Sequence, residues 1–196
     1  MILIIALILL VLYLIPKYKK PRIIPNFLSV DECSHIMKKA VNKLDVSRVS
    51  ETHNIDKNVR DSETAWLDLD DPIVKRVAER CVSLTDRPLC NCEKLQVLRY
   101  KPGGHYKPHQ DTFSDSEPNK RMYTVILALN DDYEGGETEF PNIKKQYKLR
   151  TGDALFFDTL DNYELMTSMA LHGGRPVKSG EKWICNLWVH KYPYIA

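Results

Sequence analysis

The feature that most constrains this chain of 196 residues is a His-x-Asp triplet, His109-Gln-Asp111, joined by a distant histidine, His172. A turn signal at 102–104 precedes the triplet, and Pro108 fixes the backbone directly before the first histidine. Because side chains alternate along an extended segment, residues 109 and 111 project from one face and can reach one metal. Two histidines and one carboxylate can hold one face of an Fe(II) octahedron and leave three positions open. A surface turn with a solvated histidine and aspartate is the alternative.

A strand is predicted at 182–190 from its aromatic and β-branched residues. One face is wholly apolar and suits a sheet surface covered by helices, whereas the other is mixed in chemistry, as a pocket wall is. A lysine buried in that wall needs an anionic partner, because an isolated buried charge is costly. The alternative is a strand-entry lysine that stays in solvent. The mixed face holds Lys182, Ile184, Asn186, Trp188 and His190, and the apolar face holds Trp183, Cys185, Leu187 and Val189.

These residues belong to a series of motifs that resembles the prolyl 4-hydroxylase (alpha-subunit type) branch of the Fe(II)/2-oxoglutarate-dependent dioxygenases. The resemblance runs from Ile24 to Tyr192, and the motifs follow one another in the expected order. Several ordered motifs are more specific than any one of them. Beside the triplet, they are Val59-Arg-Asp-Ser-Glu-Thr-Ala-Trp-Leu67, Arg121–Asn130, Gly135-Gly-Glu-Thr-Glu-Phe-Pro141, Gly152-Asp-Ala-Leu-Phe-Phe157 and His172-Gly-Gly-Arg-Pro-Val177.

The resemblance implies catalytic and cofactor-binding roles for six residues. Lys182 would pair with the distal carboxylate of 2-oxoglutarate, where a point charge suits the end of a flexible diacid. Tyr100 would hold the same co-substrate through its hydroxyl, and Thr138 would line the same pocket. The iron ligands would be His109, Asp111 and His172.

Four further residues align with positions that shape the peptide-proline site of that family: Tyr106, Arg121, Trp188 and His190. Ordinary aromatic packing is the alternative for Tyr106 and Trp188. The segment 112–120 is shorter than in many relatives, where this loop often helps to cover the substrate. Substrate identity is therefore what the resemblance constrains least.

The expected enzyme resembles procollagen-proline 4-dioxygenase. It would use Fe(II), take 2-oxoglutarate and O2 as co-substrates, and convert peptidyl proline to 4-hydroxyproline with release of succinate and CO2. Ascorbate is expected as an accessory reductant. Two alternatives stay open: a hydroxylase of another side chain such as lysine, and a membrane-tethered, non-catalytic binding protein with the same fold. The presence of all three ligands, Tyr100 and Lys182 counts against the second alternative.

Length and charge agree with one catalytic domain, residues 23–196. The formal net charge is +2, but four basic residues within 17–22 contribute +4 of it. The other 24 basic and 26 acidic residues leave about −2, which argues against a nucleic-acid partner.

Residues 1–22 are predicted to form a single-pass membrane anchor with a basic flank. The run Ile2–Ile15 is uninterrupted and apolar, and Pro16 closes it. A helix over residues 1–15 would span only about 22 Å, less than the roughly 30 Å of a hydrocarbon core. A cleaved signal peptide is disfavoured, because no basic n-region and no small-x-small site is present. Orientation stays open: charge placement favours a cytoplasmic catalytic domain, and the resemblance favours the lumen of the endoplasmic reticulum.

Helices first and strands later predict an α+β protein with a mainly β core, a double-stranded β-helix (jelly roll) buttressed by N-terminal helices. A capping box, Ser29-Val-Asp-Glu32, opens one helix, and Asp71-Pro72 opens a second. Residues 45–64 are polar and predicted as loop, and strands dominate from Glu93 onward. The residues expected to face inward are Cys33, Ile36, Met37, Ala40, Val41 and Leu44 on the first helix, and Ile73, Val77, Cys81 and Leu84 on the second.

Overall fold

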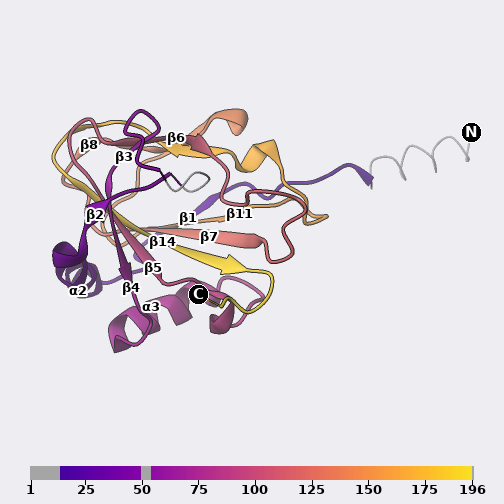
Figure 1. Cartoon of the computed structure of the whole chain (residues 1–196), viewed down its shortest axis with the longest axis horizontal. Helices are drawn as coiled ribbons and strands as arrows, with labels where there is room; N and C mark the ends of the chain where they lie inside the picture. Colours follow the sequence, from indigo (N-terminus) through magenta and orange to yellow (C-terminus); the bar gives the residue numbers. More distant parts are fainter. Residues whose placement is uncertain (1–13, 50–53, 196) are drawn as a thin grey trace, which may run out of the picture.

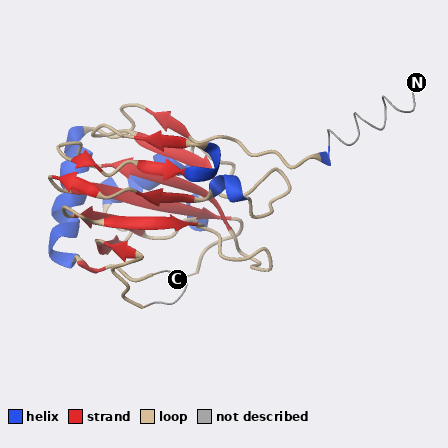
Figure 2. Ribbon diagram, turned by 90° about the horizontal axis from the view of Figure 1, so that it is seen from above, coloured by secondary structure: helices blue, strands red, loops and turns tan. Residues whose placement is uncertain are grey.

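The computed structural model describes residues 14–49 and 54–195. Two antiparallel sheets lie face to face, and two helices cover the outer face of the larger sheet (Figures 1 and 2). Helices therefore form one outer layer, the larger sheet the middle layer, and the smaller sheet the other outer layer. The predicted mainly β fold with N-terminal helices is confirmed.

Within the described residues, the larger sheet has the strand order β1-β11-β7-β14-β5-β4-β2, and every pairing is antiparallel. Neighbours in this order are often far apart in sequence, as expected where strands alternate between two sheets. The strands are β1 (Arg22–Ile24), β2 (Asp45–Val46), β4 (Glu63–Leu67), β5 (Leu95–Tyr100), β7 (Arg121–Ala128), β11 (Ala154–Asp158) and β14 (Lys182–His190).

The smaller sheet has the order β10-β9-β12-β6-β3, again antiparallel throughout. Two further short strands, β8 (Glu134–Gly135) and β13 (Val177–Ser179), pair with each other. The strands of the smaller sheet are β3 (Arg60–Asp61), β6 (His105–His109), β9 (Thr138–Phe140), β10 (Lys145–Tyr147) and β12 (His172–Gly174).

The two faces of the larger sheet bury two separate cores. On β14, Trp183, Cys185, Leu187 and Val189 belong to the core shared with the helices, as predicted. Ile184 belongs to the core between the sheets. Because successive side chains of a strand point to opposite faces, β14 takes part in both cores at once.

The first helix, α2 (Val30–Ala40), begins at the predicted capping box. The Ser29 hydroxyl accepts from the backbone N–H of Glu32 at 3.1 Å, and the Glu32 carboxylate accepts from the backbone N–H of Ser29 at 2.9 Å. The predicted inner face is right for its central residues, since Cys33, Ile36 and Ala40 are buried. It is wrong for Val41, because the α-helix ends at Ala40 and a short 3-10 turn, Val41–Lys43, follows.

The second helix, α3 (Pro72–Val82), begins as predicted, with the Asp71 side chain accepting from two backbone N–H groups. Its buried face is rotated from the predicted one. Val74 and Ala78 are buried beside Val77 and Cys81, whereas Ile73 and Leu84 are only partly buried. The observed spacing of three, four and seven residues is that of one helical stripe.

The prediction of a loop over residues 45–64 is wrong in part. The short strands β2 and β3 lie in this stretch, and β4 begins in it at Glu63. Two-residue strands carry too little hydrophobic alternation to be seen in a sequence. All five cysteines are free thiols, and Cys33, Cys81 and Cys185 are buried as predicted.

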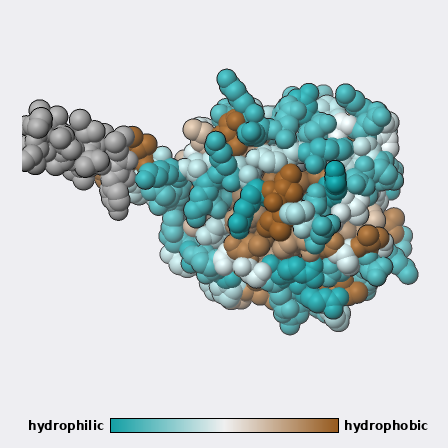
Figure 3. Space-filling model, turned by 180° about the vertical axis from the view of Figure 1, so that it is seen from behind, coloured by the Kyte–Doolittle hydropathy of each residue, from teal (hydrophilic) through white to brown (hydrophobic). Residues whose placement is uncertain are grey.

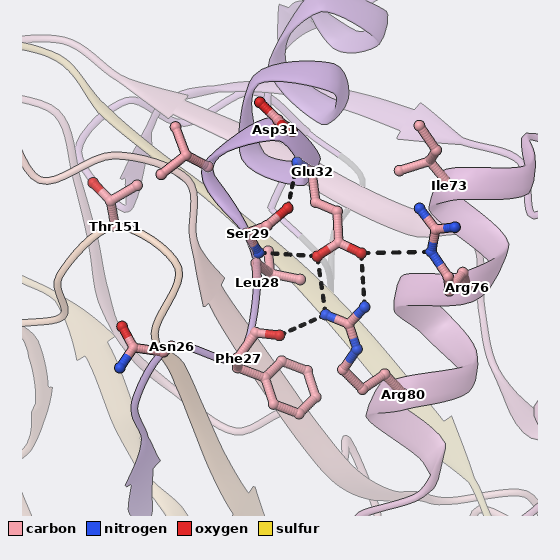
Figure 4. Close-up of a pocket in the computed structure, with 11 residues that line it drawn as sticks. Asn26, Phe27, Leu28, Ser29, Asp31, Glu32, Ile73, Arg76, Arg80 and Thr151 are labelled. Atoms are coloured by element: carbon pink, nitrogen blue, oxygen red, sulfur yellow. Dashed lines mark hydrogen bonds and ion pairs between the residues drawn. The ribbon is translucent and has the colours of Figure 1, made fainter.

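A partly buried ion pair joins the two helices. The Arg80 guanidinium donates to both carboxylate oxygens of Glu32, at 2.7 and 2.9 Å, and to the Phe27 backbone oxygen at 2.6 Å (Figure 4). Hydrogen bonds from Arg80 lower the pKa of Glu32 to about 2 against the opposing effect of burial. These contacts line a hollow of about 680 Å³, in which the Glu32 carboxylate is engaged by both arginines, Arg76 and Arg80. The hollow is therefore part of the fold rather than a candidate site.

We expect Arg80→Met to lower the free energy of unfolding by about 2 kcal/mol, below the usual loss for a buried pair because Arg80 is partly exposed. The lowered pKa of Glu32 makes this stabilisation complete above pH 4.5 and lost as pH falls toward about 2. Urea unfolding at pH 7 measures the loss. Arg76→Met, which removes a 61% exposed partner 3.6 Å from Glu32, is the control. Equal losses of unfolding free energy in the two variants would contradict the conclusion that the Arg80–Glu32 pair stabilises the helix contact.

Within residues 14–49 and 54–195, no helix has the length and apolar character needed to cross a membrane. The predicted anchor falls mostly on residues 1–13, outside the described part of the chain. At its described end, Leu14 and Ile15 are exposed. Figure 3 shows apolar atoms beside the grey segment, followed by hydrophilic ones.

Candidate active site

The three predicted metal ligands converge through the pairing of two strands of the smaller sheet. His109 ends β6, and His172 begins β12 directly opposite it. Asp111 lies in a bend just after β6, so the extended segment ends earlier than predicted. Ligand atoms of the three residues nevertheless lie within 4.8 Å of one another. Among residues 14–49 and 54–195, this is the one such group of three or more His, Cys, Asp or Glu side chains.

Gly173 allows β12 to approach β6 closely enough for this convergence. A Cβ atom at Gly173 would lie 2.8 Å from the Tyr106 backbone oxygen and 2.9 Å from the Pro108 nitrogen. Real Cβ atoms do not come so near to backbone atoms. Any side chain here would force the strand that carries His172 away from the strand that carries His109.

Backbone carbonyls fix which imidazole nitrogen faces the site. His109 Nδ1 lies 2.9 Å from the Lys107 oxygen, and His172 Nδ1 lies 3.0 Å from the Ala170 oxygen. A carbonyl only accepts, so each Nδ1 carries the proton and each Nε2 keeps its lone pair. The two Nε2 atoms lie 3.7 and 3.6 Å from the Asp111 carboxylate. Both imidazoles therefore present a free lone pair beside a carboxylate, as metal ligation requires.

The protonation states also suit a divalent metal. Burial lowers the pKa of His109 to about 3, and His172 adds to this effect. Burial alone would raise the pKa of Asp111, but the two histidines, Arg121 and a hydrogen bond from Thr124 outweigh it and lower this pKa. Thr124 Oγ1 donates to Asp111 Oδ2 at 2.6 Å and fixes the carboxylate. His109 is thus neutral and Asp111 ionised at neutral pH, which are the forms that bind metals.

Aromatic rings enclose the two histidines. The Tyr106 ring stacks on His109 with centroids 3.6 Å apart. On the other histidine, the Phe140 and Phe157 rings lie 5.4 and 4.8 Å from His172. Tyr106, predicted to shape the substrate site, therefore packs directly on a candidate ligand. These rings restrict imidazole motion and keep water away from part of the site.

Lys182 is buried and lacks an anionic partner. It begins β14 opposite Tyr100, is 4% exposed, and its Nζ donates to the Gly136 oxygen at 2.7 Å. In the described residues, no carboxylate oxygen lies within 4 Å of Nζ. Burial, and then the charge of Lys148, lower the pKa of Lys182 to about 8. No carboxylate of the described residues meets the predicted need for an anion at this distance, so the carboxylate of a bound diacid would suit the position.

Tyr100 and Thr138 are both buried, and Tyr100 lies opposite this lysine on β5. The Lys182 ammonium lies 5.4 Å from the centroid of the Tyr100 ring. Burial raises the pKa of Tyr100, so its hydroxyl keeps a proton that it can donate. Thr138 begins β9 and pairs with Gly174 of β12. The Tyr100 placement fits the predicted co-substrate role, and the Thr138 role stays a prediction.

A groove of about 750 Å³ lies on the inner side of the larger sheet. Of the predicted substrate residues, Arg121 and Trp188 line it, and the Arg121 guanidinium lies 3.8 Å from the centroid of the Trp188 ring. Phe113 stands on the other side of this guanidinium at 5.3 Å. The other lining residues include Lys43, Asp45, Arg48, Arg60, Trp66, Glu93 and Gln96.

The buried carboxylate of Glu93 links Arg121, in the wall of the groove, to His190. This carboxylate accepts from Arg121 Nε at 2.6 Å and lies 2.8 Å from His190 Nε2. Burial would raise the pKa of Glu93, but these two partners lower it. His190 is therefore behind the wall rather than on it, and its predicted role is indirect.

Sequence reasoning missed Glu93, Arg60 and Trp66 as site residues. Arg60 is 4% exposed, lies 4.6 Å from the centroid of the Tyr106 ring, and makes no ion pair within the described residues. Trp66 is 42% exposed and faces Trp188 across 6.1 Å. Arg60 and Trp66 belong to the 59–67 motif, which carries part of the family resemblance but does not by itself indicate a role for either residue. Glu93 had no signal of its own.

The fold and the ligand set match known proteins. Residues 95–190 match the family model of the 2OG-Fe(II) oxygenase superfamily. The chain is 38% identical to a putative prolyl 4-hydroxylase of Acanthamoeba polyphaga mimivirus over 87% of this chain and 74% of that protein. The chain belongs to the prolyl 4-hydroxylase branch of the 2OG-Fe(II) oxygenases. It is also 33% identical to prolyl 4-hydroxylase 1 of Arabidopsis thaliana, over 87% of this chain and 69% of that protein.

Solved structures of this prolyl 4-hydroxylase branch agree with the two-sheet fold. The viral collagen prolyl hydroxylase of Paramecium bursaria Chlorella virus-1, solved with 2OG, superposes with a TM-score of 0.74 at 31% identity, over 89% of this chain and 97% of that one. A Pseudomonas putida prolyl-4-hydroxylase, at 15% identity and a TM-score of 0.65, shares the fold. The jelly roll is therefore confirmed, and the family uses Fe(II) and 2-oxoglutarate.

We expect His172→Ala to weaken Mn(II) binding, measured by calorimetry, by at least about a hundredfold, because it removes one of three ligand atoms. His105→Ala is the matched control: this histidine also lies on β6, but within residues 14–49 and 54–195 its imidazole has hydrogen-bond contacts to the Gly103 and Asn58 oxygens and to no candidate ligand. The control should bind Mn(II) as the unaltered protein does. Unchanged binding by folded His172→Ala protein would overturn the ligand assignment.

We expect Lys182→Met to weaken 2-oxoglutarate binding by at least about thirtyfold, the lower range for removing one partner of a buried charge pair. In the unaltered protein, affinity should fall as pH rises through about 8, because the free Lys182 ammonium then loses its proton. Lys75→Met, at an exposed position of α3 on the helix-covered side of the larger sheet, is the control. An affinity that is flat from pH 7 to pH 9 would contradict the role of Lys182.

Proposed function

We propose that this protein hydroxylates C4 of peptidyl proline, with conversion of 2-oxoglutarate and O2 to succinate and CO2. The observation that carries the proposal is the convergence of two histidines and a carboxylate in a fold that also holds an aromatic groove and a buried lysine without a carboxylate contact in the described residues. Arg121 of the groove donates to the Asp111 backbone oxygen at 3.3 Å and so links the groove to the ligand set. The membership in the prolyl 4-hydroxylase branch supports the same reaction.

His109, Asp111 and His172 would hold the iron, and their preset tautomers and ionisation need no rearrangement on binding. Bound iron, with 2-oxoglutarate and O2, supplies the oxidising chemistry that inserts one oxygen atom into a C–H bond. Lys182 and Tyr100 orient the distal carboxylate of the co-substrate, and Thr138 lines the same pocket. The protein thus contributes geometry and water exclusion. Ascorbate is proposed as the accessory reductant.

The groove suits a proline-containing peptide in an extended conformation. Proline-rich segments dock against aromatic surfaces, because their backbone is already extended and loses little entropy on binding. Trp66, Trp188 and Phe113 provide such a surface, and Arg121 can donate to peptide carbonyls. Tyr106 stacks on His109, and its ring also lies 4.6 Å from the guanidinium of Arg60, which lines the groove. We infer that Trp188, Arg121 and Tyr106 position the target proline.

A lysyl side chain is the weaker substrate. Among the described residues that line the groove, four are cationic (Lys43, Arg48, Arg60 and Arg121) and two are carboxylates (Asp45 and Glu93). Glu93 is already paired with Arg121. A second cation would therefore meet a repulsive potential. A non-catalytic binding role is disfavoured, because every candidate ligand and the lysine are in place.

A coupled assay tests the proposal. Fe(II), ascorbate and 2-oxoglutarate are added with a panel of proline-rich peptides, and succinate is measured beside the mass of the peptide. We expect peptide-dependent succinate with a gain of one oxygen atom on proline, and none with peptides in which alanine replaces proline. Lysyl peptides in the same panel test the weaker substrate. Modification of lysine instead of proline would overturn the substrate assignment.

We further propose that residues 1–22 anchor the catalytic domain to a membrane, on the strength of the apolar run. The basic flank packs on the domain: the Lys17 oxygen accepts from the Asn162 backbone N–H at 3.0 Å, and Arg22 belongs to β1. Truncated protein for assays is therefore best begun at Lys17. Carbonate extraction of the full chain should leave it in the membrane pellet, and release into the supernatant would defeat the anchor. Epitope protection in sealed vesicles distinguishes cytoplasmic from lumenal orientation.

A further inference from the structure

The turn that contacts Lys182 consists of two glycines in the left-handed region, Gly135 with φ +69° and Gly136 with φ +65°. The Gly136 oxygen accepts from Lys182 Nζ at 2.7 Å. A Cβ atom on Gly136 would lie 3.2 Å from Lys182 Cδ and 3.0 Å from the Tyr133 ring. The turn therefore lies directly against the stem of the buried lysine.

A second lysine holds the same turn. Lys148, which follows β10, donates from Nζ to the Tyr133 oxygen at 2.9 Å and to the Gly135 oxygen at 2.8 Å. The same ammonium lies 3.3 Å from the centroid of the Tyr133 ring. Lys148 is an exposed residue, yet these three contacts fix its charged end. Within the described residues, it makes no ion pair with a carboxylate.

The two ammonium groups thus bind consecutive carbonyls, Lys148 that of Gly135 and Lys182 that of Gly136. An ammonium has three N–H donors, and Lys182 uses one of them on Gly136. A shift of the turn moves the Gly136 oxygen that accepts from Lys182 Nζ, so the turn helps to set where this ammonium lies.

We propose that Lys148 is a positioning residue for 2-oxoglutarate: it clamps the Gly135–Gly136 turn so that the Lys182 ammonium meets the distal carboxylate. The inference rests on the proposed function, because it assigns the anion at Lys182 to that co-substrate. Lys148 itself touches neither the metal ligands nor the groove.

Lys148 affects co-substrate binding in two opposite ways: its hydrogen bonds to the turn favour binding, and its positive charge disfavours the protonated form of Lys182. Lys148 lowers the pKa of Lys182, and Glu137 raises it. Tyr100 and Tyr133 are the titratable groups that pack against Lys182 and the turn. Removal of the Lys148 charge therefore raises the pKa of Lys182. Loss of the clamp weakens co-substrate binding, while loss of the charge extends the binding to higher pH.

Lys148→Met tests the proposal by calorimetric titration of 2-oxoglutarate into full-length, Mn(II)-loaded protein. We expect the Kd at pH 7 to rise about tenfold, the lower range for residues that orient a ligand-binding group. The Kd for Mn(II) should not change, and the pH midpoint for loss of affinity should move above about 8. In turnover, KM for 2-oxoglutarate should rise about tenfold while kcat stays within about twofold. Lys148→Arg should restore most of the affinity, because arginine can also donate to both carbonyls.

Lys145→Met is the matched control, since it removes an exposed lysine of β10 near the same turn in sequence. It should leave the Kd for 2-oxoglutarate unchanged. A Lys148→Met protein that binds as tightly as the control, with an unmoved pH midpoint, would overturn the positioning role. Failure of the unaltered protein to bind 2-oxoglutarate at all would instead overturn the proposed function.

Discussion

The antiparallel pairing of β6 with β12 is the constraint on which the rest of the site depends. It sets His172 opposite His109, and a glycine at 173 allows the two backbones to approach. No local segment could bring these imidazoles together, since they are far apart in sequence. The neighbouring strands then provide what the pair requires: Thr124 fixes Asp111, and aromatic rings hold both histidines. The metal site is thus a product of sheet register rather than of a loop.

The larger sheet divides the molecule by chemistry. Its helix-covered face contributes to an apolar core, in which the side chains need only pack closely. Its inner face carries buried polar side chains that ordinary cores exclude, including Lys182 and Gln96. Glu93 and His190 satisfy each other, with Arg121, whereas Lys182 is left for a ligand. The lack of a carboxylate partner thus distinguishes the buried Lys182, the candidate co-substrate residue, from Glu93 and His190, which contact each other.

Some features of the fold and of the site could be predicted from the sequence and others could not, for physical reasons. The faces of β14 followed from alternation along an extended segment, and both helix starts followed from local capping chemistry. The same alternation was expected to bring His109 and Asp111 to one face, but Asp111 lies in a bend after β6, and its approach to the histidines depends on the fold. The inner face of α3 was misjudged, because Ile73 and Val74 are both apolar and only packing decides between them. Glu93 and the clamp by Lys148 depend on contacts between distant strands. Such contacts leave no mark in local periodicity, so no reading of a single sequence could have found them.

The short strand β1 has a consequence for handling the protein. It pairs residue by residue with β11, whose segment Ala154-Leu-Phe-Phe is apolar and would otherwise form the outer edge of the larger sheet. Without β1, that row of N–H and C=O groups would be open to pairing with another molecule. The basic residues around β1 add charge at the same edge, which discourages such association. The lead-in from the predicted anchor thus also acts as a guard against edge-to-edge aggregation, and chains cut within β1 would lose solubility before they lose their metal site.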